Sequence, residues 1–332
     1  MRVLIDGDPI VYRAGFSSQN DWKILRWSDV VDVDDPLTDV EHEEFFAYVW
    51  ERDAFEEEMG LHPDEVEHTI WVDPLSEQFC LKIVKDNIQN IVDAVEGYLA
   101  ETDQKVESVE VYLSGSTNFR DAVATITGSY KKDGTPVTGY KANRADKRRP
   151  HWYQRIRDYM VEVWDAQIFE GIEADDALAI AQWAEDEYAP KTIIATIDKD
   201  LQNVPGWHYN VLKKTDSMVS FKQAQVHFFR QCLTGDKTDN IAGCYRIGKT
   251  KAETLIRHDM SEESMYDVCL LAYHANVVKF PDKYPEDMTA TEALLENARL
   301  LWMLQDKDQL WTPPGEPDGS IMQEGLLDQE EW

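Results

Sequence analysis

The chain has 332 residues, enough for about two domains. It carries 33 basic and 64 acidic residues, for a formal net charge of −31 at pH 7. This charge excludes a protein that coats DNA through its overall field, and it disfavours an anionic membrane surface as a partner. The sequence has neither a long apolar run nor the pattern of a signal peptide at its start. We therefore expect a cytoplasmic protein that does not contact membranes.

Charge is distributed unevenly along the chain. Residues 1–112 carry 28 acidic and 8 basic residues, whereas residues 113–160 carry 10 basic and 4 acidic ones. The last 18 residues hold 6 acidic residues and no basic one. A single basic segment is therefore embedded in an acidic chain.

Hydrophobic patterning predicts an α/β fold. Short apolar runs predict strands at 3–5, 109–113, 161–163 and 192–197, and apolar residues at helical spacing predict helices at 88–99, 152–160 and 174–184. Strands that alternate with helices are typical of a mostly parallel sheet flanked by helices. From about residue 221 onward, helical patterns interrupted by glycine and proline predict a smaller helical domain.

Acidic side chains follow the predicted strands. Asp6 ends the first strand, Asp198 and Asp200 follow the run at 192–197, and a third acidic group precedes the helix at 174–184, namely Glu173, Asp175 and Asp176. The carboxyl ends of parallel strands meet at one edge of a sheet, where ligands bind. Like charges gathered there repel unless cations neutralise them, and oxygen-only ligands favour Mg²⁺ or Mn²⁺. The alternatives are helix capping by Asp175 and Asp176 and a solvated turn at Asp198 and Asp200.

A further acidic pair lies in residues 233–252, which read LTGDKTDNIAGCYRIGKTKA. Asp236 and Asp239 are three residues apart and can share one face of a turn or helix. The stretch from Gly243 to Gly248 looks like a helix–hairpin–helix, whose tight turns expose backbone N–H groups to a phosphate. The lysines that follow, Lys249 and Lys251, can reach the same nucleic-acid backbone.

Positive charge is concentrated at Arg120 and in residues 140–149, which read YKANRADKRR. Basic side chains neutralise phosphates, and aromatic rings such as that of Tyr140 stack on unpaired bases. The alternative is a solvated surface stretch. Next to an acidic metal cluster, the segment favours a phosphodiester as the ligand.

Three segments together resemble the flap endonuclease family, above all bacteriophage 5′-nucleases and the 5′-exonuclease domain of bacterial DNA polymerase I. These are GIEADD at 171–176, TIDKD at 196–200 and GDKTDNIAG at 235–243. Residues 140–144, YKANR, resemble the family's YKxNR arch motif, and VLIDGD at 3–8 resembles its first strand. The resemblance covers about residues 1–15 and 109–310.

The family implies a PIN-like α/β domain with a mostly parallel sheet, a helical arch and a C-terminal helix–three-turn–helix (helix–hairpin–helix) module. On this sequence, the nuclease domain spans 1–220, with an acidic insertion at about 20–80 and the basic arch at about 116–150. The helical DNA-binding module spans 221–311. An acidic tail at 312–332 is expected to be disordered, or to dock a replication protein.

The resemblance also implies residue roles. Two Mg²⁺ (or Mn²⁺) sites would be formed by Asp6, Glu173, Asp175 and Asp176, and by Asp198, Asp200, Asp236 and Asp239. Lys141 and Arg144 would act on the scissile phosphate as catalytic residues. The implied DNA contacts are Arg120, Tyr140, Gly243, Gly248, Lys249 and Lys251, with a K⁺ ion at the hairpin.

The implied activity is metal-dependent hydrolysis near the 5′ ends or flaps of DNA, or of an RNA primer in an RNA–DNA hybrid. It would leave a 5′-phosphate and a 3′-hydroxyl, in bacteriophage-type replication or repair in the host cytoplasm. One alternative is a PIN-like ribonuclease that cuts single-stranded RNA, which needs neither arch nor hairpin. Another is a non-catalytic DNA-structure-binding accessory protein. It draws support from residues 113–120, LSGSTNFR, which lack an acid that the family has there. Under the nuclease hypothesis, Ser114, Ser116 or Asp8 would compensate for the missing acid, and the first site would bind its metal more weakly.

Overall fold

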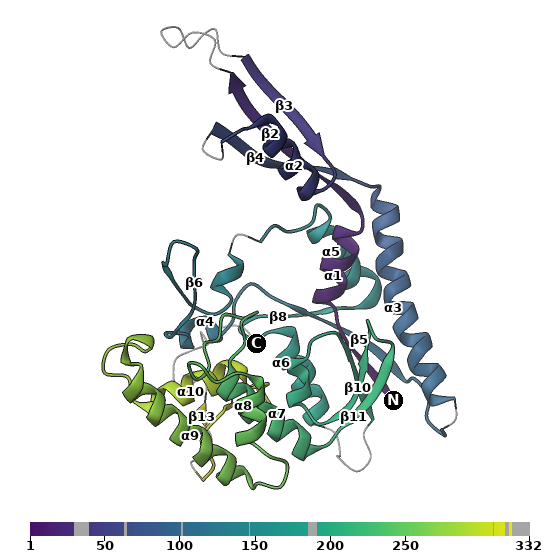
Figure 1. Cartoon of the computed structure of the whole chain (residues 1–332). Coiled ribbons are helices and arrows are strands. Elements are labelled where there is room, and N and C mark those ends of the chain that lie inside the picture. The colour runs from purple at the N-terminus through teal and green to yellow at the C-terminus, as the bar shows by residue number, and fades with distance from the viewer. Residues whose placement is uncertain are drawn as a thin grey trace. The chain divides into compact units, whose positions relative to one another are not determined.

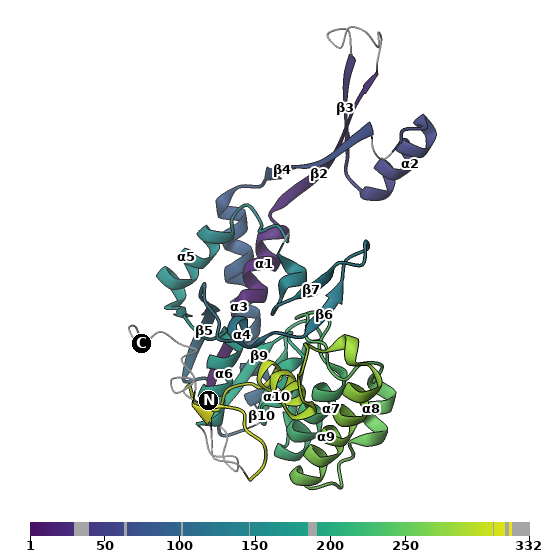
Figure 2. The ribbon, with the colours of Figure 1, turned by 90° about the vertical axis from the view of Figure 1, so that its left-hand side faces the viewer.

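A computed structural model describes residues 1–29, 40–62, 65–100, 102–145, 147–184, 191–307, 309–315 and 319–320 (Figures 1 and 2). The chain divides into two compact units. We call Met1–Pro9, Ile88–Arg148 and Met160–Trp332 the core unit, and Ile10–Asn87 with Arg149–Tyr159 the extension unit. Most of the predicted acidic tail lies outside the described residues. Among the described helices, none combines the length and the apolar character needed to cross a membrane.

The core unit is built on a six-stranded sheet with the order β11-β10-β9-β1-β5-β8. The strands are β1 (Arg2–Asp6), β5 (Ser108–Ser114), β8 (Gln167–Phe169), β9 (Thr192–Thr196), β10 (Gly206–Asn210) and β11 (Thr215–Val219). Only the pair β10–β11 is antiparallel. The predicted mostly parallel sheet is thus confirmed.

Strand β1 lies at the centre of this sheet, between β5 and β9. Asp6, its last residue, is in register with Tyr112 of β5, and Ile5 is in register with Ala195 of β9. Helix α6 (Ala174–Trp183) packs with alternate strand residues such as Leu4 in a buried cluster. Because the strands run parallel, the residues that follow β1, β5 and β9 come out at the same edge of the sheet.

Two helices of the chain follow the predicted amphipathic patterns. Helix α3 spans Glu77–Leu99 and contains the whole predicted stretch 88–99. Helix α5 spans Tyr153–Trp164, so the expected strand at 161–163 is wrong. Val161 and Val163 are exposed on the last turn of this helix, where an apolar run imitates a buried strand.

Four helices form a bundle after the sheet: α7 (Phe221–Thr234), α8 (Lys249–Leu255), α9 (Glu262–Lys279) and α10 (Ala290–Leu301) (Figure 2). Ser220 caps α7 and Thr289 caps α10, each accepting a hydrogen bond from the backbone N–H three residues later. Phe228, Tyr273 and Leu294 belong to the apolar cluster that holds the bundle together. The boundary at residue 220 and the helix–hairpin–helix identity of this module stay predictions.

The expected helical arch at 116–150 differs from what the described residues show. This segment contains the short helix α4 (Arg120–Val123), a hairpin of β6 (Thr127–Tyr130) and β7 (Pro136–Thr138), and the 3₁₀ turn η3 (Ala142–Arg144). Gly134 and Gly139 adopt positive φ angles, and a glycine-rich stretch that also carries a proline favours turns over a continuous helix. The hairpin is visible in Figure 2.

The described residues of the predicted acidic insertion include an antiparallel sheet of the extension unit with the order β3-β2-β4. Its strands are β2 (Gln19–Asp29), β3 (Val40–Phe46) and β4 (Val66–Pro74), and α2 (Val49–Met59) lies against one side of them (Figure 1). Helix α1 (Asp8–Phe16) precedes β2. The described strands hold both aromatic and acidic side chains, which explains why sequence periodicity alone did not reveal them.

Candidate functional site

Three carboxylates gather at the carboxyl edge of the core sheet. Thr196 Oγ1 donates a hydrogen bond of 2.8 Å to Asp6 Oδ2. Burial raises the pKa of Asp6 well above its usual range, and the charges of Asp8 and Asp198 raise it further. Burial also raises the pKa of Asp175, followed by the charges of Asp6 and Asp198. Asp6, Asp175 and Asp198 are therefore close enough to repel one another, as the strand-end pattern predicted.

Asp8 contacts the segment 113–120, in which the expected acid is missing. Ser114, the last residue of β5, donates its backbone N–H to Asp8 Oδ2 over 3.1 Å. The Ser114 hydroxyl accepts from Ala174 N, at 3.0 Å, at the start of α6. Among the compensating residues considered above, Asp8 therefore brings a carboxylate beside Asp6.

A second carboxylate, Glu170, binds the loop 115–117. It accepts hydrogen bonds from the backbone N–H and the hydroxyl of both Ser116 and Thr117, at 2.8–3.2 Å. Burial would raise the pKa of Glu170, but these hydrogen bonds lower it. Ser116 thus belongs to a loop that is held by Glu170, the residue directly after β8.

The arch-motif residues contact the acidic residues directly. Tyr140 donates its hydroxyl to Glu173 at 2.6 Å and lies 3.2 Å from Asp239. Lys141 Nζ donates to Glu173 Oε1 and is 3.9 Å from Asp239. Arg144 donates to Asp239 Oδ1. The fold therefore brings the basic and acidic motifs together, although Tyr140 and Asp239 are 99 residues apart in the sequence.

The charges of this contact set the protonation of its members. Burial would raise the pKa of Glu173, but Lys141 and then Arg120 hold it below the usual value. Burial would lower the pKa of Lys141, but Glu173 and Asp239 keep it raised. Lys141 is thus a cation held against a carboxylate.

Asp236 and Asp200 are each tied to a neighbouring side chain. Lys199 Nζ donates to Asp236 Oδ2, and the backbone N–H of Thr238 donates to Asp236 Oδ1 at 2.6 Å. Gln231 Nε2 donates to Asp200 Oδ1 at 2.5 Å. Burial raises the pKa of Asp200 to about 7, with Asp198 and Asp236 as further causes.

Arg120 and Asp176 differ from their predicted roles. The Arg120 side chain is 1% exposed and donates two hydrogen bonds to Asp176, at 2.5 and 2.8 Å. Its other donors bond the carbonyls of Leu300 and Trp302, at 2.9 and 2.7 Å. The prediction that Arg120 contacts DNA is therefore wrong, because its guanidinium is buried against Asp176 and two backbone carbonyls. Both oxygens of Asp176 are engaged by Arg120, so Asp176 positions the start of α6 and is not open to a metal.

The predicted hairpin residues lie at the start of α8. Gly248 is the N-cap of α8, and Lys249 and Lys251 are exposed. Gly243 has a φ of 65° and its N–H bonds Asn297 Oδ1 at 2.8 Å. A DNA contact by these residues stays a prediction.

Sequence reasoning missed a buried chain of amides behind Asp200. His227 Nδ1 lies 2.8 Å from Asn203 Oδ1, and Asn203 Nδ2 donates to Gln231 Oε1 at 2.7 Å. Gln231 then donates to Asp200. Burial lowers the pKa of His227 to about 4, so the neutral ring donates through Nδ1 and every bond of the chain points toward the carboxylate. This chain could not be predicted from the sequence, because asparagine and glutamine form no recognisable motif here.

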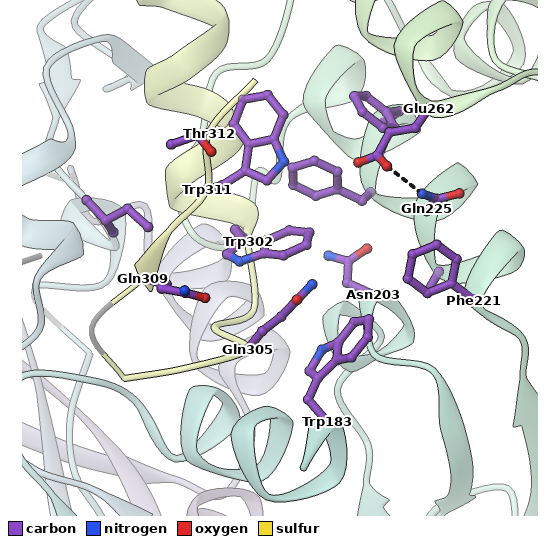
Figure 3. Close-up of a pocket in the computed structure, with 14 residues that line it drawn as sticks. Trp183, Asn203, Phe221, Gln225, Glu262, Trp302, Gln305, Gln309, Trp311 and Thr312 are labelled. Carbon is purple, nitrogen blue, oxygen red and sulfur yellow. Dashed lines mark hydrogen bonds between the residues drawn. The ribbon is translucent and has the colours of Figure 1, made fainter. Parts of the chain in front are cut away.

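Asn203 also borders a cavity of about 250 Å³ between α6, α7 and the segment after α10. Figure 3 shows Trp183, Trp302 and Trp311 around it, with a hydrogen bond of 2.9 Å from Gln225 Nε2 to Glu262 Oε2. The acidic residues at the sheet edge do not line this cavity.

The donor set suits a hard divalent cation. The carboxylates at the sheet edge offer only oxygen, which is what Mg²⁺ and Mn²⁺ prefer. In the conformation shown, no three His, Cys, Asp or Glu side chains of the described residues converge on one metal position. The mutual repulsion that raises the pKa of Asp6 and Asp175 is what a bound cation would relieve. The residues therefore fit a metal, with Lys141 and Lys199 now neutralising part of the acidic charge.

No family model matches the chain. Among curated proteins, DNA polymerase I of Deinococcus radiodurans is 30% identical over 155 residues, covering 43% of this chain and 16% of the polymerase. The chain thus matches less than a fifth of that relative's length.

Solved structures of bacteriophage T5 proteins are also similar to this chain. The T5 5′-exonuclease with bound zinc is 13% identical, with a TM-score of 0.44 over 91% of this chain and 89% of that one. The T5 flap endonuclease in a complex with DNA and metal ions is 14% identical, with a TM-score of 0.39 over 67% and 80%. The motifs named DNA polymerase I and bacteriophage 5′-nucleases, and proteins of both kinds are among those to which this chain is similar.

Proposed function

We propose that the protein is a metal-dependent 5′-nuclease that hydrolyses phosphodiester bonds near the 5′ ends or flaps of DNA, or of RNA primers on DNA. The products would be a 5′-phosphate and a 3′-hydroxyl. The setting we propose is bacteriophage-type replication or repair in a host cytoplasm.

One observation carries the proposal. The arch-motif cations Lys141 and Arg144 lie on Glu173 and Asp239, beside the acidic edge of the core sheet. A phosphodiester is anionic, so its cleavage needs cations on the reacting group and a means of holding metal. The contact of these cations with the carboxylates supports the proposal that both kinds of group act at one site.

The carboxylates Asp6, Asp8, Asp175, Asp198 and Asp200 would hold Mg²⁺ or Mn²⁺. When bound, such ions lower the pKa of a water and stabilise the leaving oxygen. Lys141 and Arg144 would stabilise the negative charge of the phosphate. The ring of Tyr140 would offer a stacking surface to an unpaired base.

The proposal is tested by Asp198→Ala. We expect the variant to lose Mg²⁺-dependent cleavage of a labelled 5′-flap duplex and to bind that duplex normally in Ca²⁺. Asp267→Ala, on the exposed surface of α9, is the matched control and keeps activity. Equal cleavage by Asp198→Ala and the wild type would refute the assignment.

The same assay separates the alternatives on a panel of flap, nicked duplex, blunt duplex, RNA–DNA hybrid and single-stranded RNA. Preference for single-stranded RNA would favour a ribonuclease. Binding of flap DNA without cleavage in any divalent metal would favour a non-catalytic accessory protein. We also propose that residues 243–251 hold the duplex backbone, with K⁺ at the hairpin, because Lys249 and Lys251 are exposed there. Replacing K⁺ by Li⁺ should then weaken duplex binding.

A further inference from the structure

Within the described residues, one face of the extension sheet carries exposed aromatic side chains, and α2 does not pack on it. Helix α2 packs on the other face, where Phe55 contacts Trp27 and Phe46 at ring-centroid distances of 5.7 and 5.3 Å. Successive residues of a strand point to opposite faces. Trp22 and Ile24 therefore lie on the face away from α2.

Aromatic side chains close over the centre of this face. Phe45 is in register with Ile24, and Trp71 is in register with Trp22. The rings of Phe45 and Trp71 meet edge to face, 6.4 Å apart, across the central strand. They cover Ile24, which is 5% exposed, but are themselves 47% and 52% exposed. We call these four residues the Phe45–Trp71 face.

The rim of this face is charged. Arg26, on the same side of β2, pairs with Glu43 at 2.5 Å and lies 3.9 Å from Glu67. Both glutamates are exposed. Across residues 19–74 the sequence has 18 acidic and only 3 basic residues. An exposed aromatic patch within a polar rim is typical of a protein interaction site.

The charge of the rim decides which partner fits. A nucleic acid would bring phosphates against the acidic surface, and a second copy of this chain would bring a net charge of −31. An arginine- or lysine-rich segment has the complementary charge. Its guanidinium groups can stack on the indole of Trp71 and form paired hydrogen bonds with Glu43 and Glu67.

We propose that the Phe45–Trp71 face docks a basic, arginine-rich segment of another protein. The aromatic rings are the anchors, because tryptophan and similar side chains carry most of the binding energy in such contacts. The acidic rim speeds the encounter and makes it sensitive to salt. This gives the acidic insertion a recruiting role that is independent of cleavage at the core sheet.

The test uses the full chain and a short synthetic peptide of alternating arginine and leucine. We expect Phe45→Ala/Trp71→Ala to bind the peptide about tenfold more weakly than the wild type. Leu271→Ala/Val278→Ala is the matched control: these side chains are 68% and 83% exposed on α9, and peptide binding should not change. Cleavage of flap DNA should be the same in all three proteins. Equal peptide affinity in the aromatic variant and the wild type would overturn the proposal.

A second measurement covers the case in which uncovering Ile24 unfolds the sheet. A photo-reactive benzophenone side chain placed at Phe45 keeps the bulk of the ring. It should crosslink the arginine–leucine peptide, whereas the same group at Leu271 should not. Crosslinking to a single-stranded oligonucleotide in preference to the peptide, or to a second copy of the chain, would contradict the proposed partner.

Discussion

Arg120 and Asp176 form a two-point ion pair that is closed off from solvent, with N–O distances of 2.5 and 2.8 Å. Removing one member of such a pair leaves an uncompensated buried charge, which costs about 3–5 kcal/mol. Arg120→Met should therefore lower the free energy of unfolding by about that amount, measured by urea denaturation. The double variant Arg120→Met/Asp176→Leu should lose less. A double variant that is less stable than Arg120→Met would contradict this account.

The same pair shows what the sequence could and could not reveal. Asp175 and Asp176 are neighbours on a helix, so they point about 100° apart and cannot both face the sheet edge. That much could be read from the pattern, and only Asp175 joins Asp6 and Asp198. The partner of Asp176 is 56 residues away, and no periodicity reports such a pairing. The proximity of Asp6 and Asp198 could be predicted from the strand ends, because the hydrophobic runs that form the central strands are visible in the sequence.

Two glycines of the predicted hairpin should respond differently to alanine. A Cβ at Gly243 would lie 2.2 Å from Gly235 N, at a φ of 65°. A Cβ at Gly248 would meet nothing within 4 Å. Gly243→Ala should destabilise the protein by about 1–3 kcal/mol or more, and Gly248→Ala should change stability little. Thermal unfolding of both variants checks this, and similar losses in the two would refute the geometric explanation.

Asp200 should make the metal-free protein less stable as the pH rises. Its pKa is raised to about 7 when folded, from an ordinary value of 3.8, so the folded state holds the proton more tightly. The resulting stabilisation is complete below the unfolded pKa and is lost as the pH rises through the folded one. The slope contributed between these values is at most about 1.4 kcal/mol per pH unit. Urea denaturation in EDTA across this range should show a fall that Asp200→Asn reduces; an unchanged slope in that variant would contradict it.

Gln231 should control how tightly Asp200 binds a cation. Gln231→Met keeps the side-chain volume but removes the hydrogen bond to Asp200 Oδ1. Because groups behind a metal ligand orient it, we expect about 10–100-fold weaker binding of Mn²⁺, measured by calorimetry. Gln225→Met, on the same helix but bonded to Glu262, is the control. If both variants bind Mn²⁺ more weakly, the cause is a disturbed helix α7 and the specific role of Gln231 is contradicted.

Lys141 should matter for cleavage far more than for folding. Lys141→Met removes the cation from Glu173 and Asp239, and we expect cleavage of flap DNA to fall about 10²–10³-fold. Lys132→Met, on the exposed turn of the hairpin, is the control and should retain activity. Single-turnover rates at saturating enzyme separate this loss from weaker binding. If Lys141→Met cleaves flap DNA at a rate within a few-fold of the wild type, Lys141 has no catalytic role.

The β6–β7 hairpin is fastened at its base and closed on itself at its tip. Asn240 donates from one amide to the carbonyls of Val137 and Gly139, at 3.0 and 2.9 Å. At the tip, Lys131 donates its backbone N–H to the Thr135 carbonyl at 2.8 Å, and Gly134 donates its N–H to the Lys131 carbonyl at 3.0 Å. The base of the hairpin is therefore tied to the acidic loop, whereas the exposed Lys132 at its tip is a site for a dye. A fluorophore attached at Lys132 would report movement of this hairpin during a single turnover.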